Sequence, residues 1–396
     1  MHEPSSVQPR LQLAIQSLQQ GKMQQARTMF ESLCNEQPSV TQAWFGLAYV
    51  CGQLEDFNAS IAAIGHVLDH EPKNVKALIF KADQLVYNKQ ERMALSFYDG
   101  ALQLTSKQAN LPDEIVRGLQ RGMVLREKYD TQYREYLLSA LTKKGYERGK
   151  VSQRFDQALD ISFGTKEIFL QQPTRFYFPG LPQRAFFERN EFPWLRKLEA
   201  KIPAIKYELQ AMLNGQEQFS PYLDSGSTEP NFVKHLDIVD SLNWSAAYLW
   251  HYGVLNNHIA EQCPNTKQAL DTAPLPFITG QTPVALFSKL KAGVKIPPHH
   301  GLLNTRLICH LPIIVPKNCG GLRVGNETRQ WEDGKALIFD DSIEHEAWNT
   351  SSEERVVLLF DIWRPELTED EKGLITDMLI AVDEFSEQGK HLYITS

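Results

Sequence analysis

The sequence predicts a multidomain α + β protein, in which an N-terminal α-helical solenoid precedes a β-rich domain with flanking helices. Two observations support this fold class. The first hundred residues repeat every 34 residues, and after about residue 164 short β-forming runs alternate with turn residues. Hydrophobic residues make up 42% of the 396 residues, so both parts can bury a core. We expect helical repeats in 1–105, a helical connector in 106–165 and the β-rich domain in 166–396.

Small and large apolar residues recur in the first region at matching positions of successive helix pairs. The residues that share this spacing are Ala26, Ser60 and Ala94, then Phe30, Ile64 and Tyr98, then Ala43 and Ala77, and finally Pro38 and Pro72. Small residues let two helices approach closely, large ones fill the space between pairs, and proline cannot continue a helix. This is the pattern of tetratricopeptide (TPR) repeats, whose helix pairs must stack to bury their apolar faces. A plain helical bundle is the alternative interpretation.

Basic residues crowd the predicted connector between residues 117 and 150. Such a run is typical of a solvated helical face. A docking surface for an acidic partner is the alternative that we favour less.

The third region combines four predicted strands with two predicted helices. The strands are expected at 283–290, 305–315, 335–339 and 355–363, and their turn-separated spacing indicates a sandwich or a double-sheet barrel. Apolar residues at helical spacing predict a helix over 194–213, which Pro203 should kink or split. A second helix is expected over 368–387, with Thr368 as its N-cap and Glu371 completing a capping box.

Charge and cysteine usage narrow the classes of partner and compartment. A formal net charge of -7 gives no general attraction for nucleic acid or for an anionic membrane. The five cysteines are scattered and form no Cys-x-x-Cys pair, which favours a reducing compartment over a disulfide framework. No apolar run approaches the ~18 residues needed to cross a bilayer. We therefore expect a cytoplasmic protein without nucleic-acid or integral membrane contacts.

Four of the eleven histidines are candidates for a metal site. They are His299, His300, His310 and His345. Two imidazoles with open coordination positions suit ferrous iron that must also take a bidentate co-substrate and oxygen. The usual oxygenase site adds a carboxylate two residues after the first histidine, and Gly301 occupies that position here. By spacing alone this weakens the iron interpretation, because a single histidine is more often a core or surface residue than a ligand.

A family resemblance extends over 288–367, and more weakly over 176–182, so that it covers roughly half of the chain. The residues that carry it include Pro298-His299-x-Gly301-x-x-Asn304, Arg323-Val324-Gly325-Asn326-Glu327-Thr328, Trp331-Glu332-x-Gly334-Lys335, Phe339-Asp340-Asp341-Ser342-x-Glu344-His345-Glu346-x-Trp348 and Asp361-x-Trp363-x-Pro365-Glu366-Leu367. These motifs resemble the catalytic core of the aspartyl/asparaginyl β-hydroxylase family. The resemblance implies a double-stranded β-helix (jelly-roll, cupin-like) catalytic domain.

The resemblance also implies an iron(II) site that has only two histidine ligands, with glycine where a carboxylate normally lies. By position the metal ligands would be His299 and His345, and Gly301 becomes a supporting feature. Asp341 would be a catalytic residue that holds a metal-bound water. The alternative for Asp341 is a plain turn aspartate.

The co-substrates that the resemblance implies are 2-oxoglutarate and oxygen. A bidentate guanidinium suits the distal carboxylate of 2-oxoglutarate, and the family places an arginine at the position of Arg355, assisted by Ser288 and His310. Well-known animal members have an arginine where this chain has Ile308, and Arg306 could supply part of that charge because alternate strand residues share a face. A surface arginine and a core histidine are the alternatives for Arg355 and His310.

The expected activity is therefore hydroxylation of a C–H bond, first of all at the β-carbon of Asp or Asn in a peptide or protein. The helical arm supports a peptide or protein partner, since stacked helix pairs form concave binding surfaces. A lipid acyl chain or a small molecule is the alternative substrate. A repeat scaffold without catalytic activity is a further alternative.

Overall fold

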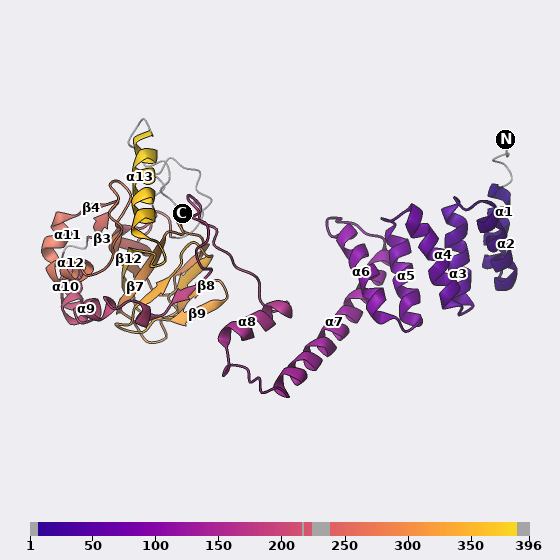
Figure 1. The fold of residues 1–396 in the computed structure, drawn as a ribbon, viewed down its shortest axis with the longest axis horizontal. Coiled ribbons are helices and arrows are strands. Elements are labelled where there is room, and N and C mark those ends of the chain that lie inside the picture. Colours follow the sequence, from indigo (N-terminus) through magenta and orange to yellow (C-terminus); the bar gives the residue numbers. More distant parts are fainter. Residues whose placement is uncertain (1–6, 216–217, 224–237, 386–396) are drawn as a thin grey trace. The chain divides into compact units, whose positions relative to one another are not determined.

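The structure is a computed structural model that describes residues 7–215, 218–223 and 238–385 (Figure 1). The chain divides into two compact units, Met1–Leu159 and Asp160–Ser396, each with its own core. The predicted α + β fold class is confirmed, because the first unit is helical and the second is built around antiparallel sheets. The predicted boundaries at 105/106 and 165/166 stay predictions.

Three helix pairs form the repeats of the first unit. They are α1 (Val7–Gln19) with α2 (Met23–Glu36), α3 (Thr41–Gln53) with α4 (Phe57–His70), and α5 (Val75–Tyr87) with α6 (Glu91–Thr105). The 34-residue spacing places Ala26, Ser60 and Ala94 at corresponding sites in the second helix of each pair, where all three are fully buried. The predicted prolines, Pro38 and Pro72, follow the ends of α2 and α4.

Close contacts explain the small residues of the repeats. A Cβ placed on Gly46 in α3 would overlap the Phe30 ring of α2, so this glycine makes room for the large residue of the preceding pair. The buried Ser60 hydroxyl is satisfied because it donates to the backbone oxygen of Ala48, 2.7 Å away. Asp56 and Asn74 begin their helices by accepting hydrogen bonds from backbone N–H groups in the first turn.

A long helix, α7 (Asp113–Thr142), packs against the last repeat, and α8 (Gln153–Ser162) follows it. Gly118 and Gly122 of α7 allow this approach, since a Cβ at either position would overlap Ile79 or Tyr98. The predicted basic run supplies ion pairs that tie α7 to α5 and α6, and these pairs are Arg121–Asp83, Arg126–Asp99 and Lys128–Glu91. Much of the basic run is therefore used within the unit.

Two antiparallel sheets form the centre of the second unit. The eight-stranded sheet has the order β1-β10-β7-β12-β5-β3-β2, with β4 paired to β3, and the four-stranded sheet has the order β6-β11-β8-β9. The bounds are β1 (Phe186–Phe187), β2 (Ser220–Pro221), β3 (Trp244–His251), β4 (Val254–Leu255), β5 (Ala285–Leu290), β6 (Lys295–His299), β7 (Arg306–Ile314), β8 (Gly321–Val324), β9 (Glu327–Gln330), β10 (Leu337–Phe339), β11 (His345–Trp348) and β12 (Arg355–Trp363).

From β5 to β12 the chain passes repeatedly between the two sheets, so that most sequence neighbours lie in different sheets, and only β8 and β9 form a hairpin within one sheet in this part of the chain. This crossing is the double-stranded β-helix, and it decides the earlier choice between a sandwich and a double-sheet barrel in favour of the barrel. The four predicted strands are present as β5, β7, β10 and β12.

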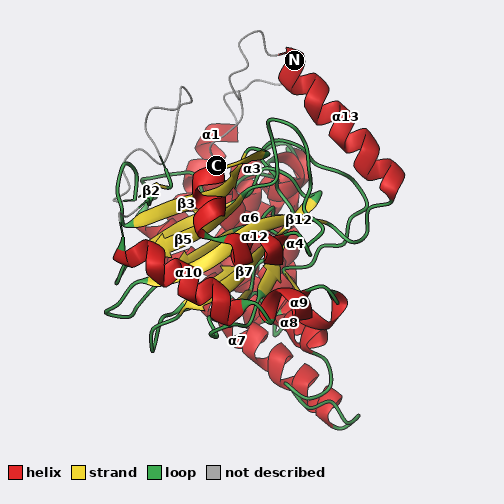
Figure 2. Cartoon of the chain, turned by 90° about the vertical axis from the view of Figure 1, so that its left-hand side faces the viewer, coloured by secondary structure: helices red, strands yellow, loops and turns green. Residues whose placement is uncertain are grey.

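Helices cover the outer face of the large sheet (Figures 1 and 2). They are α9 (Leu195–Glu199), α10 (Ile202–Asn214), α11 (Asn257–Gln262) and α12 (Pro264–Leu270). The predicted helix over 194–213 is split in two, and Pro203 lies in the first turn of α10, where proline is tolerated. A separate apolar core fills the space between the sheets and includes Trp244, Leu322 and Phe339.

The C-terminal helix α13 (Glu369–Phe385) begins as predicted, with the reciprocal Thr368–Glu371 capping box. Residues 386–387 of the predicted helix lie outside the described residues. Among the described helices none is both long enough and apolar enough to cross a lipid bilayer.

Candidate functional site

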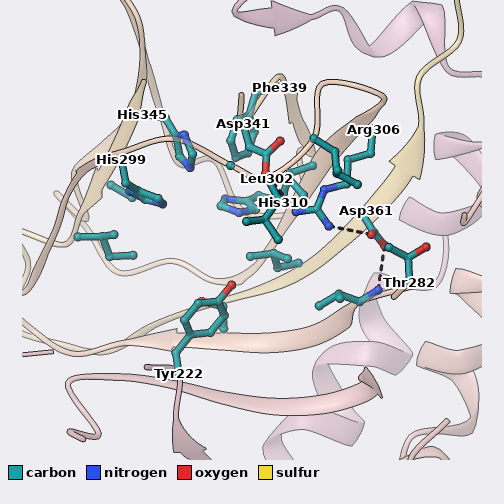
Figure 3. A pocket seen from close by; sticks show the side chains of 18 of the residues that line it. Tyr222, Thr282, His299, Leu302, Arg306, His310, Phe339, Asp341, His345 and Asp361 are labelled. Carbon is teal, nitrogen blue, oxygen red and sulfur yellow. Dashed lines mark hydrogen bonds and ion pairs between the residues drawn. The ribbon is translucent and has the colours of Figure 1, made fainter. Parts of the chain in front are cut away.

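Two histidines from the small sheet meet at one end of the barrel cavity. His299 at the end of β6 is paired in register with His345 at the start of β11, and their ring centroids lie 4.1 Å apart (Figure 3). A bulge follows His345 and shifts the register of the two strands. All seven predicted site residues line the same cavity, whereas His300 does not.

Each of the two rings is oriented by a backbone carbonyl two residues earlier in the chain. Nδ1 of His299 lies 2.8 Å from the oxygen of Pro297, and Nδ1 of His345 lies 3.1 Å from the oxygen of Ile343. A proton on Nδ1 satisfies these contacts and leaves Nε2 of each ring with a lone pair for a ligand. Burial lowers the pKa of His299 and lowers that of His345 well below its usual value, which keeps both imidazoles neutral at neutral pH.

Asp341 fills the space where a side chain at position 301 would lie. A Cβ on Gly301 would fall 2.1 Å from Oδ2 and 2.8 Å from Oδ1 of Asp341. The backbone N–H of Gly301 also donates to the backbone oxygen of Asp341, 2.6 Å away. The carboxylate that a conventional site carries two residues after the first histidine is therefore replaced in space by a carboxylate from the segment between β10 and β11.

The Asp341 carboxylate is buried and only partly satisfied. Its Oδ2 accepts a long hydrogen bond of 3.4 Å from Arg306, while Oδ1 has no hydrogen-bond partner among the described residues. Burial raises the pKa of Asp341 to about 6, against the opposing effect of the Arg306 guanidinium. A buried, unpartnered carboxylate oxygen next to two neutral imidazoles favours a cation or a metal-bound water in this part of the cavity.

Arg306 forms ion pairs with two carboxylates. Besides Asp341, it binds Asp361 on β12, with Nη1 to Oδ2 at 3.1 Å. The prediction that Arg306, Ile308 and His310 share a face of one strand is confirmed, because all three line the cavity. The assignment of Arg306 to 2-oxoglutarate stays a prediction, and its two ion pairs indicate that it also serves the protein itself.

Arg355, at the start of β12, forms no ion pair with any carboxylate among the described residues. Its side chain is 1% exposed, and neither Nε nor Nη1 has a hydrogen-bond partner among the described residues. Burial lowers the pKa of Arg355 to about 10. Burying a charge without a partner is costly, so a guanidinium in a cavity wall indicates a site for an anion. Its planar fork matches a carboxylate.

The remaining two predicted residues line the cavity along with Arg355. Ser288 on β5 accepts a hydrogen bond from the indole Nε1 of Trp244, 3.1 Å away. His310 on β7 is buried, its Nδ1 has no partner among the described residues, and its pKa is well below the usual value because of burial and the nearby Arg355. Both side chains therefore keep hydrogen-bonding capacity for a ligand.

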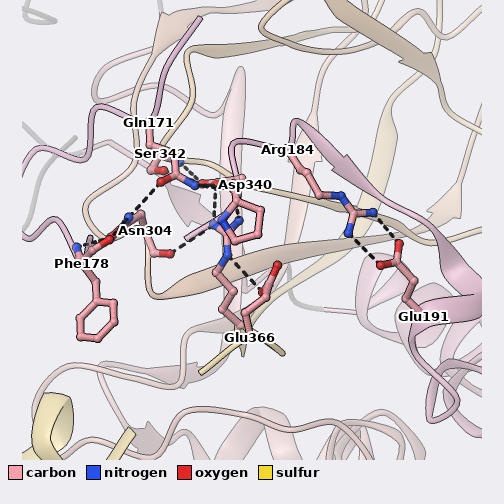
Figure 4. A network of polar contacts seen from close by, with 10 residues as sticks. Gln171, Phe178, Arg184, Glu191, Asn304, Asp340, Ser342 and Glu366 are labelled. Atoms are coloured by element: carbon pink, nitrogen blue, oxygen red, sulfur yellow. Dashed lines mark hydrogen bonds and ion pairs between the residues drawn. The ribbon is translucent and has the colours of Figure 1, made fainter. Parts of the chain in front are cut away.

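A second aspartate in the same turn has a structural role. Asp340 is fully buried and accepts hydrogen bonds from Arg364 and Gln171, both at 2.6 Å, and from the backbone N–H of Ser342 (Figure 4). Asn304 joins this network by binding Gln171 and the backbone of Phe178. The turn aspartate that we considered as the alternative for Asp341 is therefore its neighbour, which fixes the turn and leaves Asp341 facing the cavity.

Four further residues of the site had no role in the sequence prediction. Asp361 and Trp331 lie inside the motifs that carried the resemblance, where only their presence was noted. Tyr222 and Trp244 lie outside the strong motifs, and they stack with their ring centroids 3.9 Å apart. A buried strand with an aromatic residue at its start was the available signal for Trp244, and Tyr222 had none.

The residues present fit a ferrous ion. The two Nε2 atoms and the unpartnered oxygen of Asp341, whose carboxylate occupies the space beside Gly301, form a cradle for one cation. Throughout the described part of the chain, no group of three or more His, Cys, Asp or Glu side chains is arranged to hold a metal. Two imidazole ligands would leave open positions on an iron that also takes a bidentate ligand.

Comparison with known proteins agrees with this geometry. Residues 199–365 match the family model described as "Aspartyl/Asparaginyl beta-hydroxylase", and all seven predicted site residues lie inside this range. Over 181 residues the chain is 36% identical to an ornithine lipid ester-linked acyl 2-hydroxylase of Rhizobium tropici, covering 45% of this chain and 60% of that protein. Over 131 residues it is 38% identical to the human aspartyl/asparaginyl β-hydroxylase, covering 33% of this chain and 17% of that protein.

In both comparisons the chain spans less than two thirds of the relative's length. Among solved structures, the TPR2B domain of yeast Sti1 aligns with 30% of this chain and 95% of that chain, at 18% identity and a TM-score of 0.27.

Proposed function

Since residues 199–365 match the model of the aspartyl/asparaginyl β-hydroxylase family, we propose that this chain is an iron(II)- and 2-oxoglutarate-dependent hydroxylase. One observation carries the cofactor part of this proposal. The cavity that joins His299 to His345 also contains the Arg355 guanidinium, buried and without a counter-charge. A metal cradle and an anion anchor in one cavity suit a metal that is chelated by a keto diacid.

The side chains have separate tasks in this proposal. His299 and His345 would hold the iron through Nε2, while Asp341 would orient a water or an open coordination position with its free oxygen. Arg355 and Ser288 would bind the distal carboxylate of 2-oxoglutarate, and His310 would contact it between the anchor and the metal. Iron and 2-oxoglutarate together supply the activation of oxygen for C–H hydroxylation.

Part of the cavity wall is apolar and would shield this chemistry from water. The barrel core provides Ile296, Ile308 and Leu322, and Leu302 and Leu303 come from the loop before β7. A dry wall protects a reactive oxidant from side reactions and holds the substrate in one orientation.

The first substrate class is Asp or Asn in a peptide or protein, hydroxylated at the β-carbon. The name of the human relative supports it, as does the helical unit, because stacked helix pairs present concave surfaces to peptides. The peptide or protein partner and its binding to the repeats belong to this proposal.

A lipid acyl chain is the second candidate. The specific observation in its favour is that Arg306 already has two carboxylate partners and Ile308 is apolar, so of Arg306 and Arg355 in the described cavity wall only Arg355 is left to bind an acidic group. The Rhizobium tropici relative is named for such a substrate.

Turnover of 2-oxoglutarate by the full chain tests the proposal. The protein is supplied with iron(II), ascorbate and 2-oxoglutarate, and succinate is followed by NMR with and without Asp- and Asn-containing peptides or acyl lipids. We expect succinate from the wild type, and a product that gains one oxygen atom by mass spectrometry with one substrate class. His345→Ala should lose iron and turnover together. A wild-type chain that binds no iron and makes no succinate would instead support a scaffold without catalytic activity.

A further inference from the structure

We propose that Asp361 is a positioning residue that acts through Arg306 to keep one oxygen of Asp341 free beside the two histidines. This inference rests on the proposed function, because it concerns how the protein prepares the metal cradle. Asp361 itself lies on the far side of Arg306 from Asp341 (Figure 3).

Asp361 is a fixed point in the wall. Its side chain is fully buried, and Oδ1 accepts a hydrogen bond of 2.9 Å from the backbone N–H of Val284. Strand β12 holds it on both sides, because β12 is paired with β5 and with β7, where Asp361 is in register with Ile308. The Asp361 carboxylate is therefore fixed in position, and the Arg306 side chain must adopt the conformation that reaches it.

Arg306 is held unequally by its two carboxylates. Nη1 lies 3.1 Å from Oδ2 of Asp361, whereas Nη2 lies 3.4 Å from Oδ2 of Asp341. Nε makes no hydrogen bond among the described residues. The guanidinium is therefore nearer to Asp361 and makes one long contact with Asp341, although a guanidinium and a carboxylate favour a short bidentate pair.

The consequence for Asp341 follows from this unequal sharing. A bidentate Arg306–Asp341 pair would occupy both carboxylate oxygens and draw them away from the histidines. With Asp361 holding Arg306 back, Oδ1 of Asp341 stays unpartnered in the space that Gly301 leaves open. Asp361 thus determines how much of the Asp341 carboxylate is available to a cation.

Asp361→Asn separates the charge from the shape at this position. The amide oxygen can still accept from Val284, while its NH2 group, a donor, would repel the Arg306 guanidinium toward Asp341. We expect the full-length variant to bind Co(II), used alone as a probe and followed by its visible absorption, about 10–100-fold more weakly than the wild type. The absorption band should also shift, which a merely structural role would not cause.

A second variant makes the inference specific. In Asp361→Asn combined with Arg306→Met, no guanidinium remains to close on Asp341, so Co(II) affinity should recover to within about fivefold of the wild type. Glu208→Gln is the matched control, because Glu208 is a buried carboxylate with four hydrogen bonds to Asn265 and Thr266 in the outer helical layer. It should lower stability and leave the Co(II) spectrum unchanged.

The two levels of inference fail differently. If the wild type binds Co(II) with no dependence on His345, the metal cradle and hence the proposed function are wrong. If wild-type binding requires His345 but Asp361→Asn has the wild-type affinity and spectrum, the positioning role of Asp361 is wrong. The same conclusion follows if the double variant binds Co(II) no better than Asp361→Asn.

Discussion

The guanidinium carbon of Arg355 lies over the face of the Trp331 ring, 4.7 Å from its centre. The same indole stacks on His310, with ring centroids 5.5 Å apart. Trp331 therefore contacts both Arg355 and His310, which we assign to 2-oxoglutarate. It stabilises a guanidinium whose Nε and Nη1 have no hydrogen-bond partner among the described residues. A buried cation–π contact is worth about 2 kcal/mol.

Replacement of Trp331 by Leu should weaken the binding of 2-oxoglutarate more than that of the metal. The loss of the π face frees the guanidinium, and the expected rise in the 2-oxoglutarate requirement is about 5–30-fold. Succinate formation at varied 2-oxoglutarate measures it, with Co(II) affinity as the second readout. Trp194→Leu in the outer core is the control, and an equal rise in that variant would contradict a specific role.

Arg355→Met should make the metal-free protein more stable while it abolishes productive 2-oxoglutarate binding. The substitution removes a buried charge without a counter-charge and keeps an apolar side chain of similar length, a change that is often neutral or stabilising. Six of the seven tryptophans lie in the second unit, so denaturation followed by tryptophan fluorescence reports this domain. A loss of stability would show that the contact with Trp331 outweighs the cost of burying the charge.

We expect that a carboxylate at position 301 can replace the carboxylate at position 341 beside the histidines. The space does not allow side chains at both positions at once. Gly301→Ala places a Cβ against the Asp341 carboxylate and should reduce Co(II) affinity at least about 10-fold. Gly301→Asp combined with Asp341→Gly opens the space and returns a carboxylate to it, so affinity should recover. Calorimetric titration compares the variants, and wild-type affinity in Gly301→Ala would contradict the crowding.

Asp341 should make the metal-free domain less stable as the pH rises. Its pKa is raised from 3.8 to about 6, so between these values the unfolded chain releases a proton that the folded chain retains. The stability that this group contributes is fully present below pH 3.8. It falls by roughly 3 kcal/mol as the pH rises through the window between the two pKa values, and it does not change further above that window.

Asp341→Asn, compared with the wild type at pH 4.5 and pH 7 in a chelator, isolates this contribution. The variant should gain stability relative to the wild type on going to pH 7. A difference that does not change with pH would show that Asp341 is already ionised in the folded, metal-free protein.

The helical unit offers a matched pair of glycines. A Cβ on Gly122 of α7 would overlap the Tyr98 ring, whereas a Cβ on Gly100 of α6 meets only Leu78 at 3.9 Å. Gly122→Ala should destabilise the first unit by about 1–3 kcal/mol, and Gly100→Ala should stabilise it by up to ~1 kcal/mol through helix propensity. Amide hydrogen exchange in α5 and α6 distinguishes the two results.

The sequence predicted the repeats and the site better than the barrel's full set of strands. The 34-residue spacing of Ala26, Ser60 and Ala94 depends only on local packing, and four β-forming runs, those of β5, β7, β10 and β12, were visible as such. Strand β3 was missed because nearly all its residues are buried, which removes the alternation that marks a strand. Strands β8, β9 and β11 have only four residues each, so their signals are weak, and β11 pairs with the distant β6.

For the site, the motif resemblance identified seven residues that line one cavity in the structure, but it did not predict their hydrogen-bond and ion-pair partners. The Arg306–Asp361 pair spans 55 residues and depends on the register of β7 with β12. The Gly301–Asp341 relationship likewise depends on how the segment between β10 and β11 crosses the end of β6. Such cross-barrel contacts follow from the closed fold and leave no periodic pattern in the sequence.

The described charges around the histidines have a consequence for how the cavity fills. In the described cavity wall, Arg306 and Arg355 carry two positive charges, and Asp341 and Asp361 carry two negative charges, so these four formal charges cancel. The half-buried Arg175 is not included in this sum. A divalent cation alone would leave an excess of two positive charges among these buried groups, and a dianionic keto acid alone would leave two negative ones. Both together restore electroneutrality, so each should bind far more tightly once the other is present.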